Sequence, residues 1–550
     1  MTKPGYSNGV AAFAWSQALD DLGWAGADGV DLAWTLVDRH VAAGRGHQTV
    51  IHWIGADGTD RRVSFVELAS ESRRVASLLH RQGLKPGDRV AGLLPRVPET
   101  IAIIIGCLRA GAIYVPIFGG FSPEAVSYRL NHSAARFAFV ASVYRGLIRE
   151  NSSSATVISL GAGKLGADKP GDIDYARAIA AEPDAFVPLR VSRETPAFII
   201  YTSGSTGRPK GCVIAANMLA AMWPYVRFSL DLRPQVDVFW PTGDPSWGYG
   251  LCCYLPALAA GAMVMSVEAN ASAGVCLDII SKYGVTNFAT NPTVMRSLMA
   301  QGEAIAPAGA TVRTISCCGE PLNGEVVTFF RRVWNCTPMD HFGATEFGLP
   351  VGNHNAFSMD VKPGSMGLPA PGQRMAVVDS DGQELPPGTT GYIAQRTDEN
   401  SRYWLRYWND DDATRALFKG EWVCTGDLAR RDGDGYFWFE GRSDDIIKSS
   451  GYRIGPFEIE SALLRHPLVI EAAAVGVPDD VRGEAIKAFV VLRTPPQDPG
   501  ALSSELVQLV KSVCGRHQYP HIVEFVASLP KTQTGKIQRF LLRAPNPKGH

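Results

Sequence analysis

Helical and strand-like segments alternate along most of the chain, and this alternation limits the folds that it can adopt. Apolar residues recur at helical spacing in Val63–Gly83 and in Pro98–Gly111. The short apolar runs Asp88–Pro95 and Ala112–Phe118 are typical of buried strands. Further strands are expected at residues 263–268, 286–292 and 312–319. This alternation predicts a layered α/β architecture.

Two changes in composition divide the 550 residues further, and a chain of this length exceeds what one core usually supports. Residues 360–408 are richer in Gly, Pro and short alternating runs, which predicts a small β-rich subdomain. After the charged stretch 440–456, a helix, two strands and another helix form an α+β unit of roughly a hundred residues. We therefore expect an N-terminal domain over residues 1–442, made of layered α/β subdomains plus the β-rich subdomain, and a small α+β C-terminal domain over residues 443–550.

The composition excludes several classes of partner. A net charge of -1 gives no electrostatic reason to expect nucleic acid or a membrane surface. The first ten residues lack the apolar core of a signal peptide, and the most apolar run, Ile101–Leu108, is too short to cross a bilayer. The cysteines form no C-x-x-C pair, which indicates buried, reduced thiols rather than a zinc or redox centre. We expect a cytoplasmic enzyme.

A loop rich in glycine and hydroxyl side chains follows the apolar run Pro196–Ile200. It reads YTSGSTGRPKG from Tyr201 to Gly211. Glycines let backbone N–H groups approach a ligand, and hydroxyls and a lysine add donors and positive charge, which suits a polyphosphate. The P-loop pattern does not fit, because Gly211 follows Lys210 and no glycine directly precedes it. Taken alone, a flexible Gly/Ser surface loop explains the same residues as well.

Five further motifs follow this loop in order: GEP (Gly319–Pro321), FGATE (Phe342–Glu346), TGD (Thr425–Asp427), GRSDDIIKSSGYRIGPFEIE (441–460) and PKTQTGKIQR (Pro530–Arg539). Together the six motifs resemble the adenylate-forming superfamily of acyl-CoA synthetases, peptide-synthetase adenylation domains and luciferases. The resemblance covers residues 35–545 and is closest to the acetyl- and medium-chain acyl-CoA synthetases. LPRVPE (94–99) resembles the medium-chain enzymes, whereas FGGFSPEA (118–125) resembles acetyl-CoA synthetase.

The resemblance implies a ligase that uses ATP, Mg²⁺ and coenzyme A in two steps. A carboxylate attacks the α-phosphorus of ATP to give acyl-adenylate and pyrophosphate, and the thiol of CoA then displaces AMP. Three residues take catalytic positions. Lys536 would bridge the carboxylate and the α-phosphate, Thr345 would donate to the α-phosphate, and Glu346 would hold Mg²⁺.

The resemblance also implies the residues that bind the nucleotide. Asp427 would accept the ribose hydroxyls, Arg442 would support the ribose or a phosphate, and Phe342 would stack on adenine without the hydroxyl that many relatives carry there. For His341 a structural or adenine-edge role is expected rather than acid–base catalysis. The full ATP-binding set expected is Thr202, Ser203, Gly204, Ser205, Thr206, Gly207, Lys210, Gly319, Glu320, Pro321, Asp340, His341, Phe342, Gly343, Asp427, Arg442 and Arg453.

A mobile C-terminal domain follows from the same resemblance. It would swing about Asp444 and exchange Lys536 for a surface that admits CoA. Trp247 resembles the aromatic gate between the acyl pocket and the pantetheine tunnel, although a buried core tryptophan is the alternative. The residues expected to bind CoA are Phe118, Gly119, Gly120, Ser450, Gly451 and Tyr452.

The expected acyl pocket consists of Trp247, Gly248, Tyr249, Cys318 and Gly343. Acetyl-CoA synthetases carry a valine directly after the gate tryptophan and a tryptophan three residues before the motif glutamate. Gly248 and Gly343 stand at those positions here, and each methylene left unfilled forfeits about 0.8 kcal/mol of burial. We therefore expect a medium-chain, branched or aromatic acid larger than acetate, unless the ring of Tyr249 refills the space.

Other functions stay open at this point. A stand-alone adenylating enzyme could load the phosphopantetheine of a carrier protein, although FGGFSPEA favours free CoA. An acetyl- or propionyl-CoA synthetase is a second alternative. A catalytically silent nucleotide-binding relative is a third, and intact Lys536, Thr345, Glu346 and Asp427 weigh against it. The motif around Lys536 also resembles known targets of a lysine acetyltransferase and deacetylase, and acetylation would remove the charge that adenylation needs.

Overall fold

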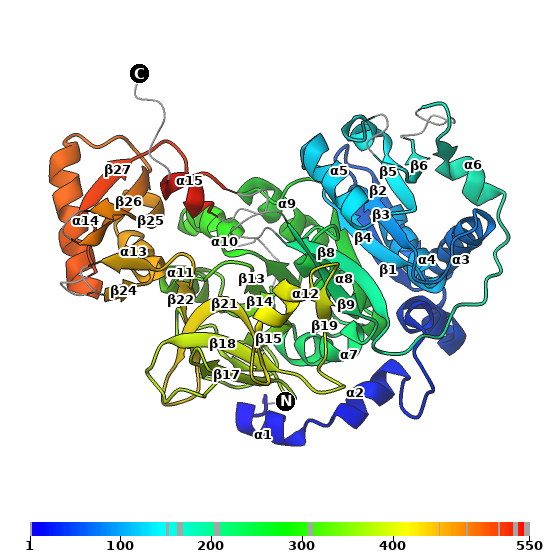
Figure 1. The fold of residues 1–550 in the computed structure, drawn as a ribbon, viewed down its shortest axis with the longest axis horizontal. Coiled ribbons are helices and arrows are strands. Elements are labelled where there is room, and N and C mark those ends of the chain that lie inside the picture. Colours follow the sequence, from blue (N-terminus) through cyan, green and yellow to red (C-terminus); the bar gives the residue numbers. More distant parts are fainter. Residues whose placement is uncertain are drawn as a thin grey trace.

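The computed structural model describes residues 3–149, 153–161, 169–202, 209–305, 312–449, 452–479, 482–514, 518–531 and 537–543. Within these ranges the strands form four sheets. In Figure 1 the light-blue to cyan segments lie on the right and the orange to red C-terminal segments on the left, with green and yellow segments between them, while the dark-blue start of the chain runs along the bottom. The combination of four sheets with many helices confirms the predicted α/β class.

One sheet has eight strands in the order β19-β9-β8-β4-β3-β5-β6-β7. Its strands are β3 (Arg89–Leu93), β4 (Ile113–Ile117), β5 (Phe137–Ala141), β6 (Thr156–Leu160), β7 (Ile173–Asp174), β8 (Pro196–Thr202), β9 (Lys210–Ala215) and β19 (Trp404–Tyr407). The predicted helices are α3 (Phe65–Arg81) and α4 (Pro98–Arg109). Their starts follow from the sequence, because Ser64 and Glu67 form a capping box and Pro98 occupies the first helical position.

A second sheet has nine strands in the order β16-β15-β14-β13-β12-β10-β11-β1-β2. Its bounds are β1 (Thr49–Ile54), β2 (Asp60–Ser64), β10 (Phe239–Pro241), β11 (Val264–Val267), β12 (Asn287–Thr290), β13 (Thr314–Cys318), β14 (Pro338–Ala344), β15 (Gly348–Gly352) and β16 (Leu368–Pro369). Strands β11, β12 and β13 confirm the three predicted from sequence. Within this sheet, β1, β11, β10, β12, β13 and β14 pair in parallel, so their carboxyl ends share one edge.

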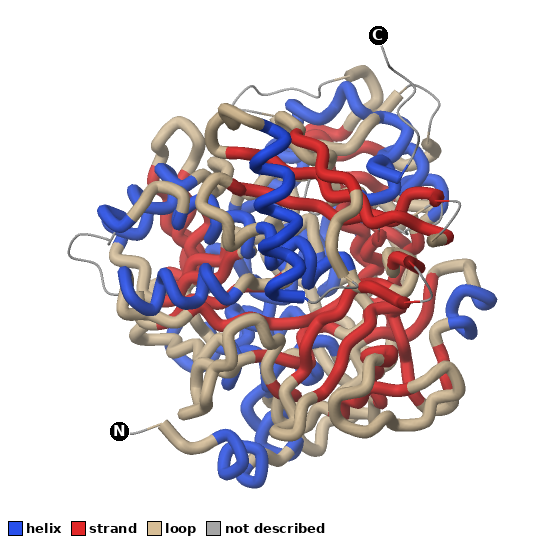
Figure 2. Tube along the Cα trace, turned by 90° about the vertical axis from the view of Figure 1, so that its left-hand side faces the viewer, coloured by secondary structure: helices blue, strands red, loops and turns tan. Residues whose placement is uncertain are grey.

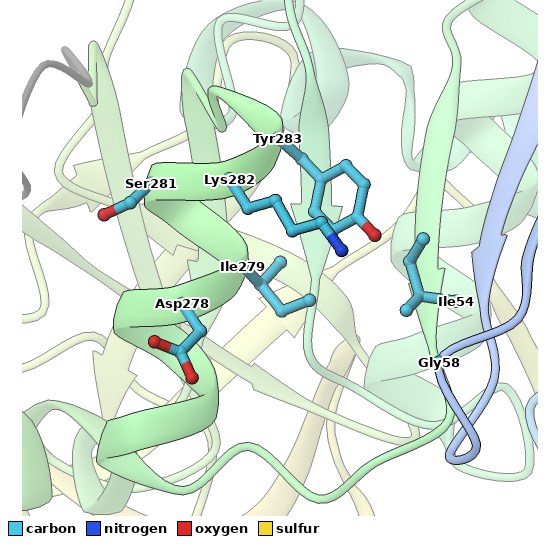
Figure 3. A pocket seen from close by; sticks show the side chains of 7 residues that line it. All are labelled: Ile54, Gly58, Asp278, Ile279, Ser281, Lys282 and Tyr283. Atoms are coloured by element: carbon cyan, nitrogen blue, oxygen red, sulfur yellow. The ribbon is translucent and has the colours of Figure 1, made fainter.

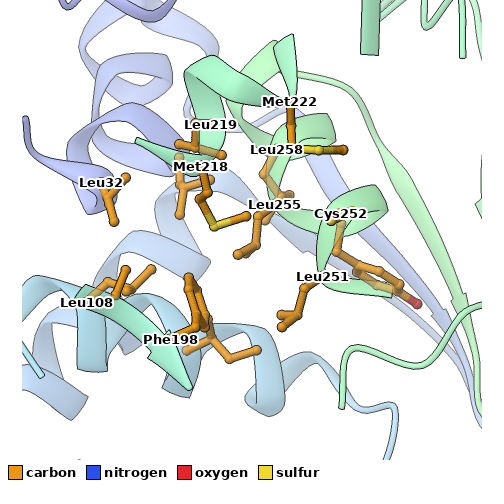
Figure 4. Packing of buried hydrophobic residues seen from close by; sticks show 14 of the residues in the cluster. Leu32, Leu108, Phe198, Met218, Leu219, Met222, Leu251, Cys252, Leu255 and Leu258 are labelled. Carbon is orange, nitrogen blue, oxygen red and sulfur yellow. The ribbon is translucent and has the colours of Figure 1, made fainter. Parts of the chain in front are cut away.

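Helices of the N-terminal region cover these two sheets, and one apolar core joins them. Figure 4 shows Leu108, Phe198, Met218 and Leu255 packed together from four different elements. Because both sheets contribute to this core, the strand ends that carry the motifs are held at fixed relative positions. The remaining helices are α1 (Tyr6–Ala12), α2 (Trp15–Leu22), α5 (Pro123–His132), α6 (Tyr175–Ala180), α7 (Met218–Ala221), α8 (Gly248–Ala260), α9 (Ala273–Tyr283), α10 (Pro292–Met299), α11 (Gly324–Val333) and α12 (Asp411–Ala416).

The β-rich subdomain extends further along the chain than predicted. Its five strands are β17 (Arg374–Val378), β18 (Gly391–Arg396), β20 (Phe418–Lys419), β21 (Trp422–Arg431) and β22 (Phe437–Arg442). The expected range 360–408 was therefore wrong at its C-terminal end. Within that range, β19 pairs with β9 of the eight-stranded sheet instead. Strand patterning gives the face that is buried but not the partner strand, which is why the sequence misplaced this segment.

The last part of the chain forms the expected α+β unit. Its elements are β23 (Ile447–Ser449), β24 (Tyr452–Ile454), α13 (Pro456–Leu463), β25 (Val469–Asp479), β26 (Gly483–Leu492), α14 (Pro499–Cys514), β27 (Ile522–Phe525) and α15 (Arg539–Arg543). Figure 2 views the molecule from the side on which this unit lies in Figure 1. The unit contacts α11, because Asn323 donates to Ser461 Oγ at 3.1 Å and Arg465 pairs with Glu325 at 3.2 Å. None of the helices in the described ranges combines the length and apolar composition that a membrane crossing needs.

Candidate active site

Strands β8 and β9 hold the two ends of the Gly/Ser loop. Thr202 ends β8 and Lys210 begins β9, and the two residues face each other in the antiparallel register. The hydroxyl of Thr202 donates to the carbonyl of Lys210 at 3.5 Å. The structure therefore fixes where the expected phosphate-binding loop begins and ends. The expected residues Ser203, Gly204, Ser205, Thr206 and Gly207 lie outside the described ranges.

Glu346 lies in the turn between β14 and β15, next to the half-buried Thr345. Its side chain is only 9% exposed, and its Oε1 accepts from the hydroxyl of Tyr407 at 2.6 Å and from Cys212 Sγ at 3.4 Å. Among the described residues, no Lys or Arg forms an ion pair with this carboxylate. A buried carboxylate is normally paired with a cation or bound to a metal. The group therefore fits Mg²⁺, which is held by one or two carboxylates together with substrate phosphates.

The GEP segment leaves β13 at the edge where the parallel strands end. Gly319 has a φ of +101°, a backbone conformation that favours glycine. The carboxylate of Glu320 accepts from Arg296 at 2.6 Å and from Thr293 at 2.8 Å. With its side chain held in this way, the segment Gly319–Pro321 has only backbone to offer a nucleotide, as the resemblance implies.

Two neighbours on β14 differ in their surroundings. Burial raises the pKa of Asp340 to about 7, although the backbone N–H of Leu322 donates to its carboxylate at 3.4 Å. His341 is buried, with Nδ1 3.3 Å from the hydroxyl of Tyr225 and Nε2 3.2 Å from the carbonyl of Asn353. Burial lowers the pKa of His341 to about 3, so the ring is neutral. Both ring nitrogens are engaged in the core, which fits the structural role that was one of the two expected for this side chain. Phe342, next along the strand, is half-buried.

Asp427 and Arg442 face each other across β21 and β22. Arg442 Nη1 donates to Asp427 Oδ1 at 3.2 Å, and the hydroxyl of Thr425 donates to Asp427 Oδ2 at 2.7 Å. Arg442 Nε also donates to Asp444 Oδ1 at 3.0 Å. The predicted ribose anchor and the predicted hinge thus share one guanidinium. For Arg453 and Tyr452 only the backbone of β24 is described, while Ser450, Gly451 and Lys536 lie outside the described ranges.

Trp247 precedes the first turn of α8 and contacts the segment expected to bind CoA. Its ring centroid lies 5.4 Å from that of Phe118 and 5.4 Å from that of Phe121. A Cβ on Gly119 would lie 2.2 Å from the ring of Tyr144, so a larger residue there requires this ring to shift. Gly120 is exposed beside it. The fold brings the expected gate and the expected CoA segment together.

The two glycines of the expected acyl pocket have different surroundings. A Cβ built on Gly248 meets no atom within 4 Å, so this position has room for a larger group. A Cβ on Gly343 would lie 2.1 Å from the carbonyl oxygen of Gly348 and 2.7 Å from Leu349 Cδ2. The expectation that Gly343 leaves space was therefore wrong. The irregular pairing of β14 with β15 brings backbone into the place that a side chain would take.

Tyr249 and Cys318 lie close together on the inner side of this region. The hydroxyl of Tyr249 is buried, and burial together with Tyr225, Cys253 and Cys318 raises the pKa of Tyr249 well above its ordinary value. Cys318 ends β13 and is 5% exposed.

Sequence reasoning missed Tyr407 and Cys212, which both contact Glu346. A signal for Cys212 was available, because residues two apart in a strand share a face and Cys212 follows Lys210 by two. No signal pointed to Tyr407, which lies outside the six motifs and reaches the site only through the pairing of β19 with β9.

A pocket of about 590 Å³ lies elsewhere, between the end of α9 and the turn that joins β1 to β2. Figure 3 shows Asp278, Ile279 and Lys282 on one side of it and Ile54 and Gly58 on the other. It shares no residue with the predicted site. Among the described residues, the predicted site also contains no group of three or more His, Cys, Asp or Glu side chains that could hold a metal alone.

Comparison with known proteins identifies the family. The protein-family model for the "AMP-binding enzyme" family matches residues 38–404. The family model for the "AMP-binding enzyme C-terminal domain" matches residues 458–536. The acetyl-coenzyme A synthetase of Bacillus subtilis (strain 168) is 34% identical over 545 residues, which cover 98% of this chain and 94% of that protein. The chain belongs to the adenylate-forming acyl-CoA synthetases. This confirms the resemblance and the enzyme class, an ATP-dependent acid–thiol ligase.

Solved structures agree with this membership. The Brucella canis acyl-CoA synthetase is 37% identical to this synthetase, with a TM-score of 0.78 and 98% of each chain covered. A benzoate CoA ligase from Burkholderia xenovorans LB400 is 28% identical, with a TM-score of 0.83, and the match covers 94% of this chain and all of that one. The large N-terminal part and the smaller C-terminal part recur in these neighbours.

Proposed function

We propose that this synthetase activates a carboxylic acid larger than acetate with ATP and transfers the acyl group to CoA, releasing AMP. The observation that carries the proposal is the position of Glu346. This buried carboxylate without a cationic partner among the described residues lies beside β9, whose first residue, Lys210, closes the Gly/Ser loop. A site of this kind accommodates a metal-bound triphosphate.

In the first step, charge must be balanced as two anions approach. Thr202 and Lys210 anchor the loop around the β- and γ-phosphates, and Glu346 holds Mg²⁺, which neutralises phosphate charge when bound. Thr345 donates to the α-phosphate, and Lys536 bridges that phosphate and the carboxylate. Positioning of the two reactants by these groups supplies the remaining rate enhancement.

The nucleoside lies between the ends of the parallel strands and the β-rich subdomain. Asp427, held by Thr425 and Arg442, accepts the ribose hydroxyls. Asp340, Phe342 and the backbone of Gly319–Pro321 surround adenine. The folded backbone at Gly319 is compatible with a close approach, because no atom lies within 4 Å of its Cβ position.

In the second step the C-terminal domain, residues 443–550, turns about Asp444. The support for this division is the change of sheet between Arg442, which ends β22, and Ile447, which begins β23. CoA enters along Phe118, Gly119 and Gly120, and Trp247 separates its pantetheine from the acyl pocket. After the rotation, Ser450, Gly451, Tyr452 and Arg453 face the site.

The size of the acid is set beside α8. Open space at Gly248 supports an acyl group larger than acetyl, and in this proposal the neighbouring Tyr249 and Cys318 limit its length. Named relatives differ in their acids, since one is an acetyl-coenzyme A synthetase and another a benzoate CoA ligase. The residues around Gly248 therefore decide the preference in this chain.

The test is CoA-dependent AMP formation with acetate, butyrate, isobutyrate, hexanoate, octanoate, benzoate and phenylacetate. We expect kcat/KM to rise beyond acetate and to identify one class of larger acid. A preference for acetate would contradict the proposed size while leaving the ligase activity in place. Absence of CoA-dependent AMP formation with every acid would contradict the function itself.

Lys536 provides a second test. Replacing Lys536 with Ala, or acetylating it, removes the ammonium needed for adenylation. We expect pyrophosphate exchange to be lost while chemically prepared acyl-adenylate is still converted to thioester. Regulation by a lysine acetyltransferase and deacetylase and a cytoplasmic location belong to this proposal, and normal pyrophosphate exchange by the acetylated protein would contradict the regulatory part.

A further inference from the structure

Strand β19 brings a distant tyrosine to the triphosphate end of the predicted site. It pairs with the edge strand β9, and the register places Tyr407 opposite Cys212, two residues after Lys210. Tyr407 is 5% exposed, so its position is set by packing. None of the six motifs contains it.

The hydroxyl of Tyr407 orients the carboxylate of Glu346. It donates to Oε1 at 2.6 Å, and Cys212 Sγ donates to the same oxygen at 3.4 Å. Within the described residues, no hydrogen bond reaches Oε2 of Glu346. Two donors on one oxygen fix the rotation of the carboxylate and leave the other oxygen available to a ligand.

The ring of the same tyrosine contacts the lysine of the loop. Lys210 Nζ lies 5.1 Å from the ring centroid of Tyr407, within the range of a cation–π interaction. One side chain therefore contacts both an anion and a cation of the predicted site, at its two ends. The orientation of Lys210 and that of Glu346 are coupled through it.

The backbone around Tyr407 is held by its own hydrogen bonds. Its N–H donates to the hydroxyl of Thr414 at 2.9 Å, and that hydroxyl donates to the carbonyl of Asp410, which caps α12. The ring of Trp404 packs edge-on against it, with centroids 5.4 Å apart. Support of this kind is what a residue needs if it is to orient another group.

We propose that Tyr407 is a positioning residue for metal-bound ATP. Its hydroxyl, assisted by Cys212, presents Oε2 of Glu346 to Mg²⁺, and its ring keeps Lys210 directed to the phosphates. The inference rests on the proposed function, because it assigns Glu346 to the metal. It predicts a defect in Mg²⁺-dependent ATP binding rather than in thioester formation.

The test compares Tyr407→Phe with Tyr254→Phe. Tyr254 lies in α8, and its buried hydroxyl donates to Ser266 Oγ of β11 at 3.1 Å, so the control is a matched loss of a buried hydroxyl. Binding of a non-hydrolysable ATP analogue is measured by calorimetry over a series of Mg²⁺ concentrations, with the ligand-free thermal midpoint as a readout of structure. We expect Tyr407→Phe to raise the half-saturating Mg²⁺ concentration about tenfold, and Tyr254→Phe to leave it unchanged. Cys212→Ala should give a smaller shift, and Tyr407→Leu a larger one because it also removes the contact with Lys210.

A third readout separates positioning from general damage. Conversion of prepared acyl-adenylate to thioester involves no triphosphate, so Tyr407→Phe should keep a rate within about twofold of the wild type. Equal Mg²⁺ dependence in wild type and Tyr407→Phe would overturn the inference alone. Failure of the wild type to bind the analogue would overturn the proposed function, and the inference with it.

Discussion

Arg442 Nε donates to Asp444 Oδ1 at 3.0 Å, and Nη1 of the same side chain donates to Asp427 Oδ1 at 3.2 Å. One guanidinium therefore joins the proposed ribose anchor to the proposed hinge. If both assignments hold, the state of the hinge and the contacts of the nucleotide are linked through this side chain. A rotation about Asp444 would separate Arg442 from one of its two carboxylate partners, Asp427 or Asp444.

Restricting the backbone at Asp444 should separate the two half-reactions. Proline fixes φ near −65°, so Asp444→Pro should hinder a rotation that needs a large change there. We expect pyrophosphate exchange within a fewfold of the wild type, and a loss of CoA-dependent AMP formation of about tenfold or more. The first half-reaction serves as the internal control for folding. An equal loss in both would show that Asp444 supports the site and not a movement.

Neutralising the ribose anchor should weaken ATP binding selectively. Asp427→Asn keeps the shape but removes the charge that strengthens hydrogen bonds from ribose hydroxyls. We expect the KM for ATP to rise about tenfold with little change in the KM for CoA. Asp381→Asn, an exposed carboxylate in the same subdomain, should leave both values unchanged. An unchanged KM for ATP in Asp427→Asn would show that Asp427 does not bind the nucleotide.

Local patterns predicted the elements well where each residue's neighbours in sequence determine the structure. The capping box of Ser64 and Glu67 and the proline at position 98 start α3 and α4 within two residues of the expected bounds. The partner of β19 could not be predicted in this way. Its alternation fits several sheets, and only the exposed edge of β9 decides between them.

For the candidate site too, the sequence indicated some residues, and the fold alone revealed others. The motifs pointed to Glu346, Asp427 and Arg442, because the resemblance assigns the charged residues of these segments to the nucleotide and its metal, and these assignments stay predictions. They did not reveal the neighbours that orient these groups, since Tyr407 reaches Glu346 through strand pairing. Gly343 shows the opposite error. Its missing side chain suggested space, but a glycine can equally mark a close approach of backbone, here from Gly348.

The two glycines of the expected acyl pocket should respond differently to substitution. Gly248→Val has room in the apo protein and should lower kcat/KM for larger acids more than for acetate, because the added methyl groups take the acyl space. Steady-state kinetics with acetate and octanoate or benzoate would measure the ratio. Unchanged selectivity in Gly248→Val would place the acyl group elsewhere.

Gly343→Ala is the contrasting variant. A Cβ there would lie 2.1 Å from the carbonyl oxygen of Gly348, which is backbone and cannot move alone. We expect a loss of stability of about 1–3 kcal/mol from overpacking, measured by chemical denaturation, whatever the acid tested. If Gly343→Ala were as stable as Gly248→Ala, the result would show that there is space for a side chain at position 343, as the sequence suggested.

Asp340 should make stability depend on pH. Burial raises the pKa of Asp340 to about 7 in the folded protein, from an ordinary value of 3.8. The folded state therefore binds more protons than the unfolded state between these values, so its contribution to stability is complete below about pH 4 and is lost as the pH rises to about 7. Relative to Asp340→Asn, the free energy of unfolding of the wild type should fall by up to about 1.4 kcal/mol per pH unit in this window. Denaturant unfolding of both ligand-free proteins at several pH values would measure the difference, and parallel curves would show that the carboxyl group ionises normally.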